Sequence, residues 1–184
     1  MSCARVPVLL GAVLAMGVCV PAAAQNGSAS AAHAAPSAPT PCESRPESHR
    51  FDFWVGDWDV TNAQGAHAGT SSVQKILGGC VVFENWTSAQ GSQGKSLNAY
   101  NAGLGMWQQF WTSQTGAVTE YRRSEWVAGS LRLTAHVPDV DSPDLVRMTF
   151  TPIDSNTVRQ LGEASADGGR TWKTSYDLYY HRVK

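Results

Sequence analysis

The stretch Phe51-Asp52-Phe53-Trp54-Val55-Gly56-Asp57-Trp58-Asp59-Val60 carries the strongest indication of fold in this 184-residue chain. Its large apolar residues recur at i, i+3, i+4 and i+7, the spacing of one helical face; they are Phe51, Trp54, Val55 and Trp58. From Gly56 onward, apolar and polar residues alternate, as in a half-buried β-strand. The stretch therefore predicts a short helical plug that runs directly into a first strand.

Short segments of alternating polarity, separated by turn residues, make up the rest of the chain. The predicted strands are 57–62, 68–77, 80–89, 95–101, 106–114, 117–127, 130–137, 144–152, 156–165 and 171–183. Regular turns between strand-length segments are typical of antiparallel sandwiches and barrels. About ten strands joined by hairpins fit an up-and-down barrel, which leaves no sheet edge exposed. We therefore predict an all-β fold, an antiparallel up-and-down β-barrel with a short N-terminal helical plug.

Several motifs give the chain a family resemblance. They are Phe51-Asp-Phe-Trp-Val-Gly-Asp-Trp, Gly79-Cys80, Glu84-x-Trp86, Trp107-x-Gln109-x-Trp111, Val158-Arg-Gln160 and Ser165-x-Asp167-Gly-Gly-x-Thr-Trp172. Together they resemble a family of exported bacterial proteins of unknown function, which we group with the lipocalin-like and nitrobindin-like calycin barrels. The resemblance covers nearly all of residues 51–184 and implies a calycin-like barrel. The family carries no established activity that could be transferred to this chain.

The resemblance also implies how the barrel closes. In calycins a basic residue of the last strand packs over the tryptophan of the first, and Arg182 and Trp58 match these roles. Such a cation–π contact contributes about 0.5–2 kcal/mol. Period-two spacing puts six residues of the last strand on one face: Trp172, Thr174, Tyr176, Leu178, Tyr180 and Arg182. The nitrobindin resemblance raises haem, but His181 has the opposite parity to Arg182 and would face outward, so we expect no cofactor.

The first 24 residues have the pattern of a secretory signal peptide. Arg5 is their single charge, an apolar run follows, and Ala22-Ala23-Ala24 ends the segment as a small-residue cleavage site. A lipoprotein signal at Cys19 is less favoured, because valine rather than a small residue precedes it. Residues 25–46 are rich in Ala, Ser and Pro and predict a disordered linker, which leaves 47–184 as one domain. The leader indicates a periplasmic or secreted protein.

Charge and cysteine content limit the partners. Removing the leader takes away one of 14 basic residues and leaves 13 against 15 acidic ones, a net charge of −2. The sequence has no basic stripe and no further apolar run of membrane-spanning length, so we expect no nucleic-acid partner and no membrane span. The oligomeric state stays open. Cys42 and Cys80 predict one disulfide in an exported protein, with two unpaired thiols as the alternative.

The segment Trp107-Gln108-Gln109-Phe110-Trp111 places two tryptophans and the amide of Gln109 on a single strand face. These residues could be ordinary core aromatics with one satisfied glutamine. They could equally line a ligand cavity with flat apolar walls and one orienting amide, because a barrel of about ten strands has room for one. We expect this face to be enclosed, since outward tryptophans would form an apolar patch without an evident partner.

A second group of residues could make that interior partly polar. Glu84 and Trp86 share one strand face, as do Asn98 and Tyr100. If Glu84 and Arg147 both point inward, they would pair and bind a polar ligand group, because a lone buried charge is costly. Alternation alone does not say which face is inward. The candidate ligand-binding residues are Glu84, Trp86, Asn98, Tyr100, Trp107, Gln109, Trp111, Arg147 and Gln160.

The run from Ser165 to Trp172 matches the Asp-box pattern, which recurs blade by blade in sialidase propellers. This chain has one copy, so we interpret it as a hairpin device in which Asp167 accepts backbone N–H groups and Trp172 anchors the turn. The histidines show no metal-ligand spacing, and we expect no metal.

The sequence therefore favours an exported lipocalin-like barrel that binds a small, largely apolar or aromatic ligand in its interior. One alternative is a cavity enzyme of the lyase or isomerase type, with Glu84, Tyr100 and Arg147 as acid–base groups. Another is an envelope interaction module with a filled barrel. The chain carries no recognised catalytic motif, so we name no catalytic residue and expect a binding protein rather than an enzyme.

Overall fold

The structure is a computed structural model and describes residues 41–138 and 141–184. The predicted signal peptide, at residues 1–24, and most of the predicted linker lie outside the described residues. The last residues of that linker, from 41 onward, form turns and the start of the first short helix.

Within the described residues, two short 3-10 helices precede eleven strands. The elements are η1 Pro46–His49, η2 Asp52–Trp54, β1 Gly56–Asn62, β2 His67–Ile76, β3 Val81–Ser88, β4 Gln93–Asn101, β5 Met106–Ser113, β6 Val118–Tyr121, β7 Arg123–Val127, β8 Ser130–His136, β9 Leu145–Asp154, β10 Thr157–Ser165 and β11 Lys173–Arg182. The predicted strands agree with these bounds to within a few residues, except that the segment 117–127 forms two strands.

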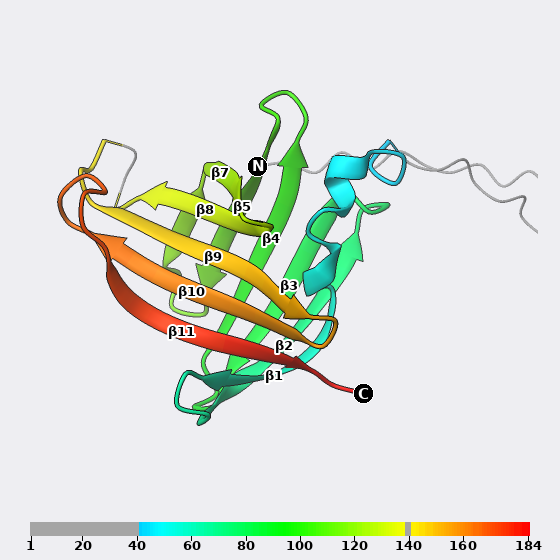
Figure 1. The fold of residues 1–184 in the computed structure, drawn as a ribbon, viewed down its shortest axis with the longest axis horizontal. Helices are drawn as coiled ribbons and strands as arrows, with labels where there is room; N and C mark the ends of the chain where they lie inside the picture. The colour runs from blue at the N-terminus through cyan, green and yellow to red at the C-terminus, as the bar shows by residue number, and fades with distance from the viewer. Residues whose placement is uncertain (1–40, 139–140) are drawn as a thin grey trace, which may run out of the picture. The chain divides into compact units, whose positions relative to one another are not determined.

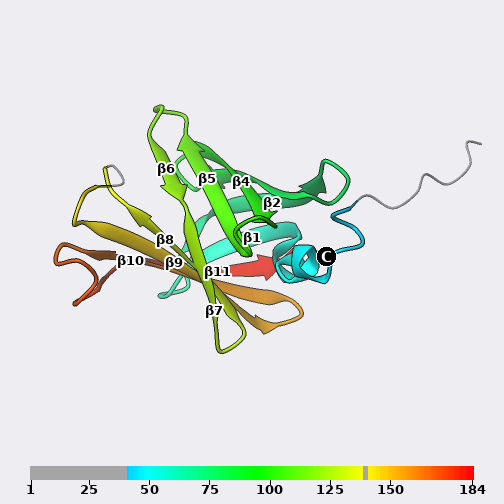
Figure 2. The same cartoon turned by 90° about the horizontal axis from the view of Figure 1, so that it is seen from above.

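All eleven strands belong to one antiparallel sheet in the order β6-β5-β4-β3-β2-β1-β11-β10-β9-β8-β7. Each neighbour follows its predecessor in the chain except where β1 pairs with β11 (Figure 1). At the two ends of this order, β7 lies against β5 and β6 against β8, so the sheet curls into a nearly closed barrel. Figure 2 shows β6 running into β7 at this seam. The predicted all-β, up-and-down, calycin-like barrel is confirmed.

The plug fills one end of the barrel, where Figure 1 draws it in cyan. Phe51 and Trp54 are fully buried and their rings stack with centroids 5.1 Å apart. Phe150 packs on both rings, at 5.0 Å from Phe51 and 4.6 Å from Trp54. The single helical face predicted for this stretch is wrong, because the chain forms 3-10 turns and Trp58 already belongs to β1. The indole of Trp58 donates to the Trp54 carbonyl at 2.9 Å, which links plug and strand.

Arg182 closes the barrel over the first strand, as predicted. It pairs with Trp58 across β1 and β11, and its guanidinium carbon lies 4.2 Å from the centroid of the indole ring. The same guanidinium donates to the Val55 carbonyl at 2.8 Å and the Phe53 carbonyl at 3.3 Å. A side chain at Gly56 would overlap this guanidinium. One residue therefore joins the last strand, the first strand and the plug.

The Cys42–Cys80 disulfide is present, as predicted. It links the segment that precedes η1 to the turn between β2 and β3, across 38 positions of sequence. The bridge therefore fastens the incoming chain to the barrel wall.

A bulge changes which residues of β11 face inward. Tyr176 pairs with Gly162, but Thr174 pairs with Glu163, so Ser175 is an extra residue in β11. The predicted common face is therefore wrong for Thr174 and Trp172, which lie on the opposite side from Tyr176. On the outer face, the indole of Trp172 lies under the guanidinium of Arg147, at 3.9 Å.

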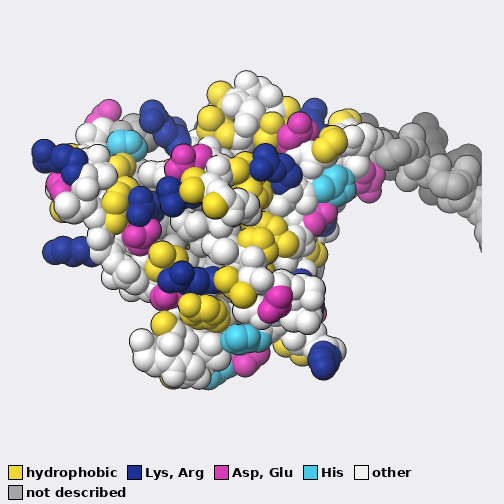
Figure 3. All heavy atoms as spheres, viewed as in Figure 1, with side chains coloured by type: hydrophobic (Ala, Val, Ile, Leu, Met, Phe, Trp, Pro, Cys, Tyr) yellow, Lys and Arg dark blue, Asp and Glu magenta, His cyan; other side chains and the backbone are white. Residues whose placement is uncertain are grey.

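Charges of both signs are interspersed on the outer surface, as the view in Figure 3 shows. Arg147 binds Glu163 through two hydrogen bonds of 2.7 and 3.0 Å. Arg159 binds Asp177 in the same two-pronged way, at 2.7 and 2.8 Å. These two ion pairs lie on the outer face of β9, β10 and β11.

Candidate functional site

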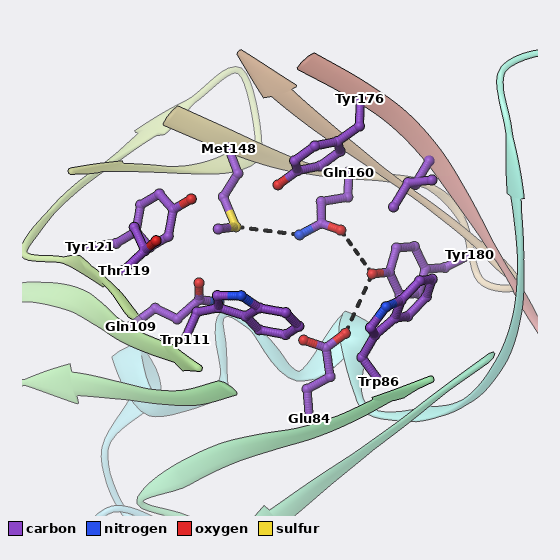
Figure 4. A pocket seen from close by; sticks show the side chains of 11 residues that line it. Glu84, Trp86, Gln109, Trp111, Thr119, Tyr121, Met148, Gln160, Tyr176 and Tyr180 are labelled. Atoms are coloured by element: carbon purple, nitrogen blue, oxygen red, sulfur yellow. Dashed lines mark hydrogen bonds between the residues drawn. The ribbon is translucent and has the colours of Figure 1, made fainter. Parts of the chain in front are cut away.

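A cavity of about 380 Å³ lies inside the barrel, between the inner faces of β3, β5 and β6 on one side and of β9, β10 and β11 on the other. Figure 4 shows the side chains that converge on it. They are Glu84, Trp86, Gln109, Trp111, Thr119, Tyr121, Met148, Gln160, Tyr176, Leu178 and Tyr180. Most of this lining is aromatic or apolar, and a few amide, hydroxyl and carboxyl groups interrupt it.

Strand glycines let the aromatic rings lie flat against the wall. Gly94 of β4 lies under the indole of Trp111, and Gly162 of β10 lies under the phenol ring of Tyr176. At either glycine a Cβ atom would overlap the ring. A glycine inside a strand often marks such a close approach. Alanine at either position would push a ring toward the cavity, so the two glycines help to set its volume.

Glu84 is the charged group of the cavity, with its side chain only 3% exposed. Its carboxylate accepts hydrogen bonds from Ser71 Oγ at 2.9 Å and Ser96 Oγ at 3.1 Å. Burial raises the pKa of this carboxyl from 4.5 to about 7, against the opposing effect of the serine hydroxyls. Glu84 can therefore hold or release a proton near neutral pH.

Neighbouring amides fix the orientation of Gln109. Asn98 Nδ2 donates to the Val82 carbonyl at 2.9 Å and to Ser96 Oγ at 3.0 Å, so its Oδ1 is left as an acceptor. Gln109 Nε2 fills that acceptor at 2.7 Å. The other end of the amide, Gln109 Oε1, is buried and has no hydrogen-bond partner among the described residues.

On the opposite wall, Tyr180, Gln160 and Met148 form a second chain of contacts. The Tyr180 hydroxyl lies 2.8 Å from Gln160 Oε1 and 3.4 Å from Glu84 Oε1. Gln160 Nε2 in turn donates to the Met148 sulfur at 3.4 Å. The hydroxyl has one proton, so it donates mainly to Gln160 Oε1, which is the nearer acceptor. Burial raises the pKa of Tyr180 well above its ordinary value, so the phenol stays neutral.

The structure brings together five of the nine predicted ligand-binding residues as lining of the cavity: Glu84, Trp86, Gln109, Trp111 and Gln160. Asn98 lies behind the wall and holds Gln109. Trp107 points inward but packs on Phe51 of the plug at 5.4 Å, and Tyr100 packs on Trp107 at 6.2 Å. These two rings belong to the filled end of the barrel rather than to the cavity.

The pairing of Glu84 with Arg147, which the sequence left open for the case that both point inward, does not occur. Met148 and Phe150 are buried on the inner face of β9, so alternation turns Arg147 outward, where it binds Glu163. Arg147 is therefore no part of the cavity.

Six lining residues were not among the predicted site residues: Thr119, Tyr121, Met148, Tyr176, Leu178 and Tyr180. Strand alternation could have identified three of them. Tyr180, Leu178 and Tyr176 share the face of Arg182, because all four lie C-terminal to the bulge in β11. Tyr121 ends β6 just before the chain changes direction at Arg122. No glycine or proline marks that break, so the side of the sheet on which Tyr121 lies could not be predicted from the sequence.

The Asp-box is a hairpin device, as interpreted from the sequence. The Asp167 carboxylate accepts from the backbone N–H of Thr171 at 2.9 Å, that of Arg170 at 3.0 Å and the Thr171 hydroxyl at 2.7 Å. These bonds, led by those from Thr171, lower the pKa of Asp167 to about 2. The Trp172 indole donates to the Gly169 carbonyl at 3.0 Å and anchors the turn.

His181 lies on the outer face, where its ring contacts the Thr61 hydroxyl at 3.2 Å. Within residues 41–138 and 141–184, no group of three or more His, Cys, Asp and Glu side chains is arranged to hold a metal ion. None of the helices in the same residues is long and apolar enough to cross a bilayer.

Fold and site together define the class: an up-and-down calycin-like barrel, plugged at one end, with an aromatic cavity around a buried carboxyl group. A comparison of the sequence with protein-family models finds no match, and a comparison with curated protein sequences finds none.

Proposed function

We propose that the chain is an exported, lipocalin-like barrel that binds a small, largely apolar ligand in its interior. The observation that carries the proposal is the cavity of about 380 Å³, lined by the flat rings of Trp86 and Trp111 and supplied with a few polar groups. Concave, largely apolar walls with few orienting polar groups are typical of small-molecule sites. The Cys42–Cys80 disulfide supports an oxidising compartment, periplasmic or extracellular.

The cavity also bears on the alternatives. A barrel filled with side chains would not leave this space, which weighs against a purely structural interaction module. The family resemblance of the FDFWxGxW opening is in keeping with the barrel and adds no activity. Ligand binding therefore stays the function best supported by the interior.

A second candidate, a cavity enzyme, rests on Glu84 alone. Its carboxyl group has a pKa of about 7 and lies beside the Tyr180 hydroxyl, and a general acid or base is most effective with a pKa near the working pH. The other two groups expected for such chemistry, Tyr100 and Arg147, lie outside the cavity. The enzyme would be favoured if the protein turns over a bound compound and if Glu84→Gln abolishes this turnover without loss of binding.

Native mass spectrometry of protein purified from the periplasm tests the binding proposal. We expect a fraction of the protein to carry one small molecule, and gentle unfolding to release it. Trp111→Phe should lower the bound fraction, because it removes part of an aromatic wall. Trp172→Phe, on the outer face, is the matched control and should leave the bound fraction unchanged. Apo protein in every preparation, with no change of tryptophan emission on adding a broad apolar panel, would contradict the proposal.

A further inference from the structure

The cavity offers its occupant acceptors rather than donors. The Gln109 amide is held so that Oε1 is the free end, and this side chain is only 4% exposed. The Glu84 carboxylate has room for about four hydrogen bonds, and two serines fill only part of that capacity. The proton of Tyr180 goes mainly to Gln160. A ligand that donates hydrogen bonds therefore fits these groups better than one that accepts them.

The hydrogen bonds around Glu84 suit its ionised form. Ser96 Oγ accepts from Asn98 Nδ2, so its own proton is left to donate to Glu84 Oε2. Ser71 donates to the other carboxylate oxygen. A carboxylate held by donors on both oxygens is stabilised as the anion. Burial works in the opposite direction because it removes water from the charge.

No positive charge compensates this anion from inside. Among the described residues that line the cavity there is no lysine, arginine or histidine. Arg147, which the sequence left as a possible inward partner, lies outside with Glu163. A buried carboxylate without a counter-charge is costly. A cation supplied by the ligand would remove that cost.

The walls around Glu84 also favour a cation. Five of the eleven lining residues are aromatic and contain tryptophan or tyrosine rings: Trp86, Trp111, Tyr121, Tyr176 and Tyr180. The face of such a ring attracts a positive charge, and the attraction is strongest where water is excluded. Figure 4 shows the Glu84 carboxylate pointing into the space between the rings of Trp111 and Tyr180.

We propose that the ligand of this cavity is a small organic amine, bound as its ammonium ion to Glu84 with its apolar body between the tryptophan rings. Gln109 Oε1 serves as a second acceptor for an N–H or O–H group of the ligand. The inference rests on the proposed binding function and adds the charge and the hydrogen-bonding character of the ligand.

Three compounds of the same length test it: 4-phenylbutylamine, 4-phenylbutanol and 4-phenylbutyrate, measured by titration calorimetry at pH 8 on protein freed of bound molecules. We expect the amine to bind at least tenfold more tightly than the alcohol, and the carboxylate to bind most weakly. Glu84→Gln should remove the preference for the amine and keep the affinity for the alcohol. Glu163→Gln changes a carboxylate on the outer face and should alter none of the three affinities.

Wild-type protein provides a second measurement that does not depend on the folding of a variant. Affinity for the amine should rise as the pH is raised from 5.5 to 8, because Glu84 ionises in this range, while affinity for the alcohol should stay level. Tyr121, Tyr176 and Tyr180 also face the cavity, but phenols titrate near pH 10 or above. Lys95 of the neighbouring strand β4 acts on Glu84 only weakly, by Coulomb attraction.

The outcomes separate the inference from the function on which it rests. If the alcohol or the carboxylate binds as tightly as the amine, or if amine affinity is the same at pH 5.5 and 8, the cavity binds ligands but the amine assignment is wrong. If none of the three compounds binds, the amine assignment is wrong, and the binding function is wrong as well if every preparation is apo and the broad apolar panel leaves the tryptophan emission unchanged.

Discussion

The buried carboxyl group of Glu84 makes the stability of the barrel depend on pH. Its pKa is about 7 in the folded protein and 4.5 in an exposed chain, so between these values the folded state holds more protons than the unfolded state. The contribution of Glu84 to stability is therefore present in full at low pH and is lost as the pH rises from about 4.5 to 7, by roughly 3 kcal/mol at most. Glu84→Gln should remove this loss. Urea unfolding of both proteins at pH 5 and pH 8 checks it, and parallel pH dependence in the two would contradict it.

Gly94 sets the position of one cavity wall, which gives a second test. In Gly94→Ala the added methyl group overlaps the indole of Trp111, which lines the cavity, so the ring has to shift. We expect ligand binding to weaken and stability to fall by about 1–3 kcal/mol from overpacking. Tryptophan emission and a ligand titration report the change. Gly103→Ala, in the turn before β5, is the control; equal effects of the two substitutions would show that Gly94 does not position the ring.

The first and last strands and the plug are held together through one side chain. Arg182→Ala removes the cation–π contact with Trp58 and leaves the Val55 and Phe53 carbonyls without their donor. We expect a loss of roughly 1–3 kcal/mol. Arg182→Lys should recover part of it, because an ammonium keeps the charge but lacks the planar fork. Thermal unfolding measures both, and melting temperatures equal to wild type would disprove the role given to Arg182.

Strand alternation predicts most of what the inside of this barrel contains. It placed Trp111 and Gln109 on one enclosed face, and Glu84 with Trp86 on another. It could not say that Arg147 faces outward, because period two defines two faces without naming the inner one. The inner face of a strand can be assigned only by counting positions from a residue whose side of the sheet is known. Arg182 is such a residue, because it covers Trp58.

Two irregularities limited this counting. The extra residue Ser175 reverses the parity of β11, so Trp172 leaves the face that Tyr176 occupies. The chain also breaks at Arg122 without a glycine or proline, which hid the inward position of Tyr121. Bulges and breaks of this kind arise from the curvature of the closed sheet. The alternation of residues within a single strand does not predict where this curvature requires a bulge or a break.

The disulfide acts on the whole molecule by restricting its unfolded chain. Closing a loop across the 38 positions between Cys42 and Cys80 should contribute about 4 kcal/mol in the chain-entropy model. The bridge fastens the segment before the plug, whereas the cavity is built from β3, β5, β6 and the last three strands. Replacing both cysteines with serine should therefore lower the melting temperature and leave ligand affinity nearly unchanged at temperatures where the variant is folded.

For the double-serine variant, calorimetry measures the melting temperature and a ligand titration measures the affinity. Wild-type protein treated with a reductant should behave like the variant, which controls for the substitutions themselves. A variant as stable as the oxidised protein would show that the bridge does not restrain unfolding. A stable variant that had lost ligand affinity would show instead that the plug, held by Cys42, controls the cavity through the contact of Trp54 with the lining residue Tyr180, whose ring centroids lie 5.9 Å apart.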